Sequence, residues 1–199
     1  MKKKLILVAS PPACGKTYIS QMIAKAVKHI VYLDKDDIGE LVRAAFCAAD
    51  EKFDMDGDFY KEKLRDAEYS SIVNIAFSAL GFEEKVILNA PFGKEVRDAG
   101  YMKNLKGRVN EQGAELVLIW VSATKEICHE RMKKRGSDRD TLKLQSFDDY
   151  IKNIDFTPPY MLKECGAVDE LVVFETEDDE SFNTSLKKTL KIISGENDA

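Results

Sequence analysis

The chain has 199 residues, of which 44% are hydrophobic and 33% charged, a composition typical of a globular protein that buries a core. Its formal net charge of −5 disfavours extended, sequence-independent binding to nucleic acid, because an acidic surface repels a phosphate backbone. These numbers favour a single domain over residues 1–199 and still allow a local basic groove.

The spacing of the cysteines and the length of the apolar runs indicate the cellular compartment. The four cysteines are scattered, without the short paired spacing of a zinc site or of a disulfide framework. The apolar run after the N-terminal lysines is too short for a signal peptide, and no stretch approaches the roughly 18 apolar residues of a membrane span. We therefore expect a cytoplasmic protein with no membrane segment, and the oligomeric state is not indicated.

Short apolar runs alternate with segments of helical periodicity. Continuous apolar runs predict buried strands over residues 5–9, 30–33, 86–88, 116–121 and 171–174. Spacings of three and four residues predict helices over 16–28, 38–48, 59–80, 94–112, 147–154 and 182–193, and a further helix that ends at Arg135 with Ser122 or Thr124 as its cap. Gly81 is expected to end the third of these helices. Alternating strands and helices predict an α/β fold with a five-stranded parallel sheet.

The strongest functional signal is the segment Ser10-Pro11-Pro12-Ala13-Cys14-Gly15-Lys16-Thr17 between the first strand and the first helix. It matches the phosphate-loop pattern G-x-x-x-x-G-K-[ST] except at Ser10, which can still make the turn if its φ is negative. Such a loop wraps a polyphosphate with backbone N–H groups at a helix N-terminus. Lys16 would reach the β- and γ-phosphates of the nucleotide and Thr17 would hold Mg²⁺, while the other contacts would come from Pro12, Ala13, Cys14 and Gly15. The alternative is an ordinary turn that happens to contain Gly-Lys-Thr.

Three acidic residues, Asp34, Asp36 and Asp37, follow the second expected strand. In open α/β sheets ligands bind at the carboxyl ends of the strands, so a carboxylate there could take the proton of an attacking hydroxyl. The alternative is a solvated acidic turn in which Asp37 caps the next helix. For the three residues together both interpretations stay open, whereas for Asp37 alone the helix cap is favoured.

Arg131, Arg135 and Arg139 are spaced four residues apart and share one face if the helix continues. Arginines beside a phosphate site would neutralise charge during phosphoryl transfer. The alternative is a solvated basic face, since two lysines lie between them. The charged, weakly patterned stretch that follows predicts a small lid over about residues 136–146.

Cys14 is a further candidate, because its loop precedes a helix N-terminus. The positive end of the helix dipole there favours a reactive thiolate. The alternative is a small, packed residue with no chemistry of its own.

Taken together, these motifs resemble the P-loop kinase superfamily, and within it the bacterial "AAA family ATPase" proteins that group with polynucleotide-kinase-like and zeta-toxin-like enzymes. The resemblance runs to about Tyr160. It rests on the phosphate loop, on the Asp36-Asp37 pair, on Val86-Ile87-Leu88-Asn89-Ala90-Pro91-Phe92, and on the arginine run with its following Asp140, Lys143 and Leu144.

The resemblance implies a three-layer P-loop NTPase fold, ATP and Mg²⁺ as cofactors, and transfer of the γ-phosphate to a small hydroxyl-bearing substrate. It also implies that Asp36 is the general base, and that Arg131 and Arg135 belong to a lid over the ATP phosphates. Lys16, Asp36, Arg131 and Arg135 are therefore the predicted catalytic residues, with Arg135 also in the nucleotide site.

Two departures from these relatives keep other functions open. Polynucleotide-kinase-like enzymes carry an arginine soon after the aspartate pair, whereas the nearest arginine here is Arg43, which argues against a nucleic-acid end as acceptor. Asn89 stands where many relatives have an aspartate, so it adds no charge for Mg²⁺. The alternatives are a nucleotide-dependent switch with slow hydrolysis, which Asn89 favours, a polynucleotide-end kinase, and a toxin-like kinase acting on a sugar nucleotide.

Overall fold

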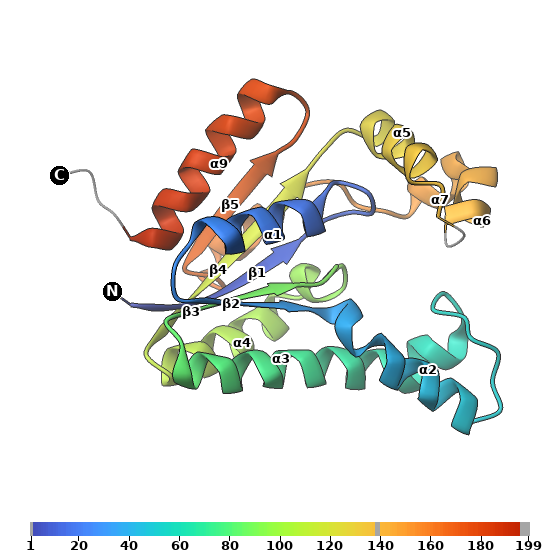
Figure 1. The fold of residues 1–199 in the computed structure, drawn as a ribbon, viewed down its shortest axis with the longest axis horizontal. Coiled ribbons are helices and arrows are strands. Elements are labelled where there is room, and N and C mark those ends of the chain that lie inside the picture. Colours follow the sequence, from blue (N-terminus) through green and yellow to red (C-terminus); the bar gives the residue numbers. More distant parts are fainter. Residues whose placement is uncertain (1, 138–139, 196–199) are drawn as a thin grey trace.

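The computed structural model describes residues 2–137 and 140–195, and its centre is a five-stranded, all-parallel sheet (Figure 1). The strand order is β2-β3-β1-β4-β5, so β1 lies in the middle between β3 and β4. The strands are β1 (Lys3–Ala9), β2 (Ile30–Asp34), β3 (Lys85–Asn89), β4 (Ala114–Ser122) and β5 (Glu170–Glu175). This arrangement confirms the predicted α/β fold.

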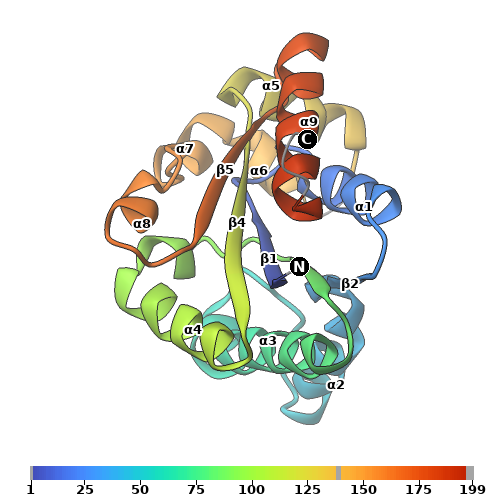
Figure 2. The ribbon, with the colours of Figure 1, turned by 90° about the vertical axis from the view of Figure 1, so that its left-hand side faces the viewer.

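Helices cover both faces of the sheet, which gives three layers (Figures 1 and 2). One face is covered by α1 (Lys16–Ala26) and α9 (Asp179–Ser194), and α5 (Lys125–Arg135) contributes Cys128 to the same core. The other face is covered by α3 (Arg65–Phe82), α4 (Ala99–Glu111) and α8 (Tyr160–Glu164). Because side chains alternate along a strand, the central strand β1 sends Leu5 and Leu7 into one core and Ile6 and Val8 into the other.

A smaller helical extension follows β2 at the carboxyl ends of the strands (Figure 1). It consists of the 3₁₀ turn η1 (Lys35–Ile38), α2 (Gly39–Ala48) and the π-helical turn η2 (Tyr60–Leu64), which leads into α3. Val42, Phe46 and Tyr60 form a separate buried cluster, which we call the α2 cluster. Rings of Phe53 and Phe59 pack edge-on against Phe46 at 5.2 and 5.1 Å between centroids.

The short elements η3 (Glu95–Arg97), α6 (Thr141–Gln145) and α7 (Phe147–Lys152) complete the described chain. Helices α5, α6 and α7 gather at the same end of the sheet as α2, on the opposite side of the strand ends (Figure 1). Within residues 2–137 and 140–195, no helix combines the length and the apolar character that crossing a bilayer requires.

Three local predictions are corrected by the structure. Helix α3 runs through Gly81 to Phe82, because a helical glycine costs only about 1 kcal/mol and neighbouring residues such as Leu80 pack in the core. Helix α8 is absent from the sequence-based prediction, since Pro158-Pro159 indicates only a break, whereas in the structure Pro159 is the N-cap and the helix begins at Tyr160. Asp37 does not cap α2; instead Asp34 accepts the backbone N–H of Asp36 and caps η1.

Candidate active site

The loop between β1 and α1 has the backbone geometry of a phosphate-binding loop. Ala13 and Gly15 take left-handed conformations with φ of 63° and 97°, whereas Ser10 does not. The glycine-like positions of this loop are therefore 13 and 15, and the serine at position 10 needs no glycine. Gly15 is the N-cap of α1 and contributes no side chain to bind the first N–H groups, so these groups point to an anion site.

Asn89 joins the phosphate loop to the neighbouring strand. Its Oδ1 accepts a hydrogen bond from Lys16 Nζ at 2.6 Å. Its Nδ2 donates to Asp34 Oδ2 at 2.5 Å and lies 3.2 Å from Thr17 Oγ1. The side chain is fully buried, and Asp34 stands directly opposite it in the register of β2 and β3. Asn89 thus holds the loop lysine and the loop threonine against the end of β2.

The oxygen atoms around Asn89 are of the kind that Mg²⁺ prefers. The hydroxyl of Thr17 and the carboxylate of Asp34 both contact the Asn89 amide. The Tyr32 hydroxyl donates to the same Asp34 oxygen at 2.7 Å, and burial together with this hydrogen bond raises the pKa of Tyr32. The sequence predicts Asp34 only as one of three candidate carboxylates, and its position as the last residue of a strand is the signal for its place in this cluster.

Replacing Asn89 with aspartate should destabilise the metal-free protein. The variant would place a second carboxylate against Asp34 in a fully buried position and would remove the amide donor. We expect a loss of about 2–3 kcal/mol in the free energy of unfolding, measured by urea titration in EDTA. ATP with Mg²⁺ should recover part of this loss, because a divalent cation offsets the two like charges.

Asn104→Asp, at an exposed position of α4, is the matched control and should leave the unfolding free energy within about 0.5 kcal/mol of the wild-type value. An Asn89→Asp protein as stable as wild type in EDTA would contradict the role given to the Asn89 amide.

Asp36 lies just beyond this cluster and is open to solvent. Its side chain is 70% exposed, and its Oδ1 is 3.5 Å from the ammonium group of Lys35. Lys35 is buried and donates to Glu68 Oε1 at 2.9 Å, while the hydroxyl of Tyr60 donates to the other oxygen of Glu68. Burial and the hydrogen bond to Glu68 raise the pKa of Tyr60. The backbone beneath Asp36 is therefore anchored to α3, while its carboxylate faces outward.

Arg131 lies in α5 and contacts the backbone of the phosphate loop at Cys14. The resemblance instead predicts this arginine in a lid over the phosphates. Its guanidinium donates to the carbonyl oxygen of Cys14 at 3.0 Å, to the Thr176 hydroxyl at 2.9 Å and to the Thr176 carbonyl oxygen at 2.8 Å. It thus joins the phosphate loop to the segment between β5 and α9. A catalytic role for Arg131 stays a prediction.

Arg135 is the last residue of α5 and pairs with Asp140. Its Nε and NH2 atoms lie 2.8 and 2.5 Å from Oδ2 of the buried Asp140, and its side chain remains 37% exposed. Arg139, the third arginine of the predicted run, lies outside the described residues, as does part of the predicted lid. The described part of the lid contains α6, where Lys143 pairs with Asp56 of the loop after α2 at 3.3 Å.

Cys14 is packed and not activated. Its thiol is fully buried and its Sγ lies 3.4 Å from Sγ of Cys128 in α5. The hydrogen bond to Cys128 and burial raise the pKa of Cys14, so the expectation of a reactive thiolate at this residue is wrong. The neighbouring thiol of Cys128 is not indicated by spacing in the sequence.

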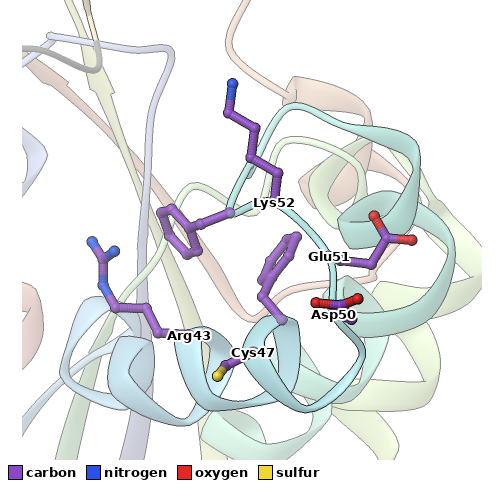
Figure 3. A pocket seen from close by; sticks show the side chains of 7 residues that line it. Arg43, Cys47, Asp50, Glu51 and Lys52 are labelled. Carbon is purple, nitrogen blue, oxygen red and sulfur yellow. The ribbon is translucent and has the colours of Figure 1, made fainter.

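A pocket of about 490 Å³ lies on α2 and the loop that follows it (Figure 3). All of its lining residues fall within positions 43–53, and none belongs to the phosphate loop. The guanidinium of Arg43 lies 4.0 Å from the ring centroid of Phe53 and pairs with Glu40 at 3.8 Å. The arginine nearest to the aspartate pair is therefore engaged within its own segment.

The parallel sheet, the loop with its Lys16 and Thr17, and the polar cluster at the strand ends define a P-loop kinase-like protein. The chain belongs to the AAA domain family AAA_33, whose model matches residues 5–157. No curated protein matches its sequence.

Solved structures share the fold at low sequence identity. A protein from Chloroflexus aurantiacus named a "putative kinase" is 19% identical with a TM-score of 0.63, and the match covers 98% of each chain. A gluconokinase from Sinorhizobium meliloti 1021 is 13% identical with a TM-score of 0.51, over 96% of this chain and 94% of that one. Shikimate kinase from Acinetobacter baumannii is 14% identical with a TM-score of 0.50, and the match covers 100% of this chain and 97% of that one.

Proposed function

We propose that the protein is a kinase that transfers the γ-phosphate of ATP, bound with Mg²⁺, to a hydroxyl group of a small molecule. The observation that carries this proposal is that the side chains of Lys16, Thr17 and Asp34 all contact the Asn89 amide. The exposed carboxylate of Asp36 follows Asp34 by two residues. Phosphate-binding groups and a candidate base thus occupy the same edge of the sheet, where ligands of open α/β folds bind.

The nucleotide would lie on the phosphate loop. Residues 13–17 would supply backbone N–H groups and the N-terminus of α1, Pro12 would contact the nucleotide without an N–H group, and Lys16 would exchange Asn89 for the β- and γ-phosphates. Thr17 and Asp34 would hold Mg²⁺, which when bound neutralises charge on the phosphate oxygens. Arg135 is partly exposed at the end of α5 and could turn from Asp140 to the phosphates.

In the proposed transfer the acceptor oxygen attacks the γ-phosphorus, ADP leaves, and Asp36 takes the proton of the acceptor hydroxyl. Asp36 suits this role better than Asp34, because Asp34 already accepts hydrogen bonds from Asn89, Tyr32 and the backbone of Asp36. Arg131 would act indirectly, by fixing the carbonyl of Cys14 and with it the shape of the loop.

The acceptor is proposed to be a small molecule. The names of the gluconokinase and of shikimate kinase, which share the fold, support this class of acceptor. A polynucleotide end is disfavoured by the net charge of −5 and by the engagement of Arg43 with Phe53 and Glu40.

A nucleotide-dependent switch with slow hydrolysis is the second candidate. The neutral Asn89 at the end of β3 favours it, since an amide adds no charge to hold Mg²⁺ for turnover.

The decisive experiment is a screen of hydroxyl metabolites, nucleosides and antibiotics for ADP release, with product mass as confirmation. A kinase should release ADP above the water background with at least one class of compound, and Lys16→Ala should abolish that release. ADP release at the water background with every compound, from a protein that binds ATP tightly, would favour the switch.

A further inference from the structure

Two buried thiols meet behind the phosphate loop. Cys14 belongs to the loop and Cys128 to α5, 114 positions further along the chain, and their sulfur atoms are 3.4 Å apart. Both side chains are almost completely inaccessible to solvent, at 0% and 1% exposure, whereas Cys47 and Cys165 are exposed. The close pair therefore links the proposed nucleotide site to the helix that carries Arg131.

The two thiols differ in the direction in which their pKa values are shifted. The hydrogen bond between them and burial raise the pKa of Cys14. That same hydrogen bond lowers the pKa of Cys128, and the positive charge of Arg131 lowers it further. Arg131 is three residues beyond Cys128 and also holds the carbonyl oxygen of Cys14. Cys128 is thus the better nucleophile of the pair.

We propose that Cys14 and Cys128 form an oxidative modification site, at which a hydroperoxide converts the two thiols into a disulfide that joins the phosphate loop to α5 and weakens ATP binding. The proposal rests on the nucleotide site proposed above, whose affinity the disulfide regulates.

The reaction has two balanced steps. The Cys128 thiolate attacks one oxygen of the hydroperoxide, the O–O bond breaks, and Cys128 becomes a sulfenic acid as hydroxide or alkoxide leaves. Sγ of Cys14 then attacks the sulfenic sulfur, the S–O bond breaks, and the thiol proton of Cys14 leaves with the hydroxyl group as water. With hydrogen peroxide, two thiols and one peroxide yield one disulfide and two waters.

The disulfide would change the shape of the loop. A disulfide bond is about 2.0 Å long, so the sulfur atoms must approach from 3.4 Å. Cys14 lies between Ala13 and Gly15, which both hold left-handed conformations, so a shift of Cys14 moves the backbone N–H groups that would hold the phosphates. Conversely, bound nucleotide would hold the loop in place and slow the opening that lets peroxide reach the buried thiols.

The test uses the full chain with Cys47→Ser and Cys165→Ser, which removes the exposed thiols. Reduced protein is treated with hydrogen peroxide, the remaining thiols are blocked, and peptides are mapped without reduction. We expect a peptide pair joined through Cys14 and Cys128, and a dissociation constant for ATP with Mg²⁺ that rises about tenfold or more in calorimetry. A thiol reductant should restore the original value, and saturating ATP should slow disulfide formation about tenfold or more.

Adding Cys128→Ser provides the control, since serine keeps a polar group beside Cys14 but cannot be cross-linked. This variant should bind ATP as the reduced parent does and should lose its response to peroxide. A peptide map with both thiols free or oxidised separately would overturn the proposal. So would a disulfide that leaves ATP affinity unchanged. Absence of ATP binding in the reduced parent would instead refute the proposed function, while the peptide map would still test the disulfide.

Discussion

Calorimetry of Lys16→Ala should show an affinity for ATP with Mg²⁺ about a hundredfold below that of the wild-type protein. Lys16 supplies the flexible cation of the phosphate loop, and a charge-assisted hydrogen bond to phosphate contributes about 2–3 kcal/mol, which corresponds to a factor of about 30–200. The variant also leaves Asn89 Oδ1 without the 2.6 Å hydrogen bond from Lys16. Asn89 can then rotate, so the effect on the loop extends beyond one contact.

The control for this experiment is Lys25→Ala, which removes an exposed lysine from the last turn of the same helix. It has the same change in net charge and should leave ATP affinity close to that of wild type. Affinity at the wild-type level in Lys16→Ala would refute the assignment of residues 12–17 as a nucleotide site.

The second large effect concerns Asp36→Asn, which keeps the size of the side chain and removes its charge. If Asp36 takes the proton of the acceptor hydroxyl, transfer to the acceptor found in the screen should fall by about 10²–10⁴. Affinity for ATP should be unchanged, because Asp36 is directed outward and Asp34 is the carboxylate bound to the Asn89 cluster. Single-turnover measurements of product with saturating ATP would separate the chemical step from binding.

Asp37→Asn is the matched control, since Asp37 is an exposed neighbour that caps no helix. Transfer at the wild-type rate in Asp36→Asn would place the base elsewhere. A steep loss of ATP affinity in the same variant would assign Asp36 to the metal site. A nucleotide switch predicts a third result, in which binding and slow hydrolysis both persist in the variant.

The sequence predicts the strands and the phosphate loop well, because their signals are local. Each strand is a continuous apolar run, and the structure extends the predicted 86–88 only to Lys85–Asn89. Ser10-Pro11-Pro12 and Gly15-Lys16-Thr17 lie within a few positions of one another, so the loop can be recognised from the chain alone. The strand order was not predicted, since an apolar run carries no information about its neighbour in the sheet.

The contacts that organise the site were missed because they join distant positions. Lys16 and Asn89 are 73 residues apart, and Arg131 and Cys14 are 117 apart. The spacing of Arg131 and Arg135 correctly predicts one helix, yet one side chain binds the phosphate loop and the other binds Asp140. Local spacing places residues on an element, whereas their partners depend on how the elements pack.

The α2 cluster has a consequence for how this chain tolerates change. Val42, Phe46 and Tyr60 are buried apart from the two cores that hold the sheet, and the Tyr60–Glu68 hydrogen bond is one of the links to α3. Substitutions in separate clusters usually have additive effects on stability. Mutations that repack Val42 or Phe46 should therefore add to the effects of mutations in β1 and the phosphate loop on the free energy of unfolding, without changing them. In evolutionary terms, the segment after β2 can diverge faster than the phosphate loop, so relatives that share the loop need not share this segment.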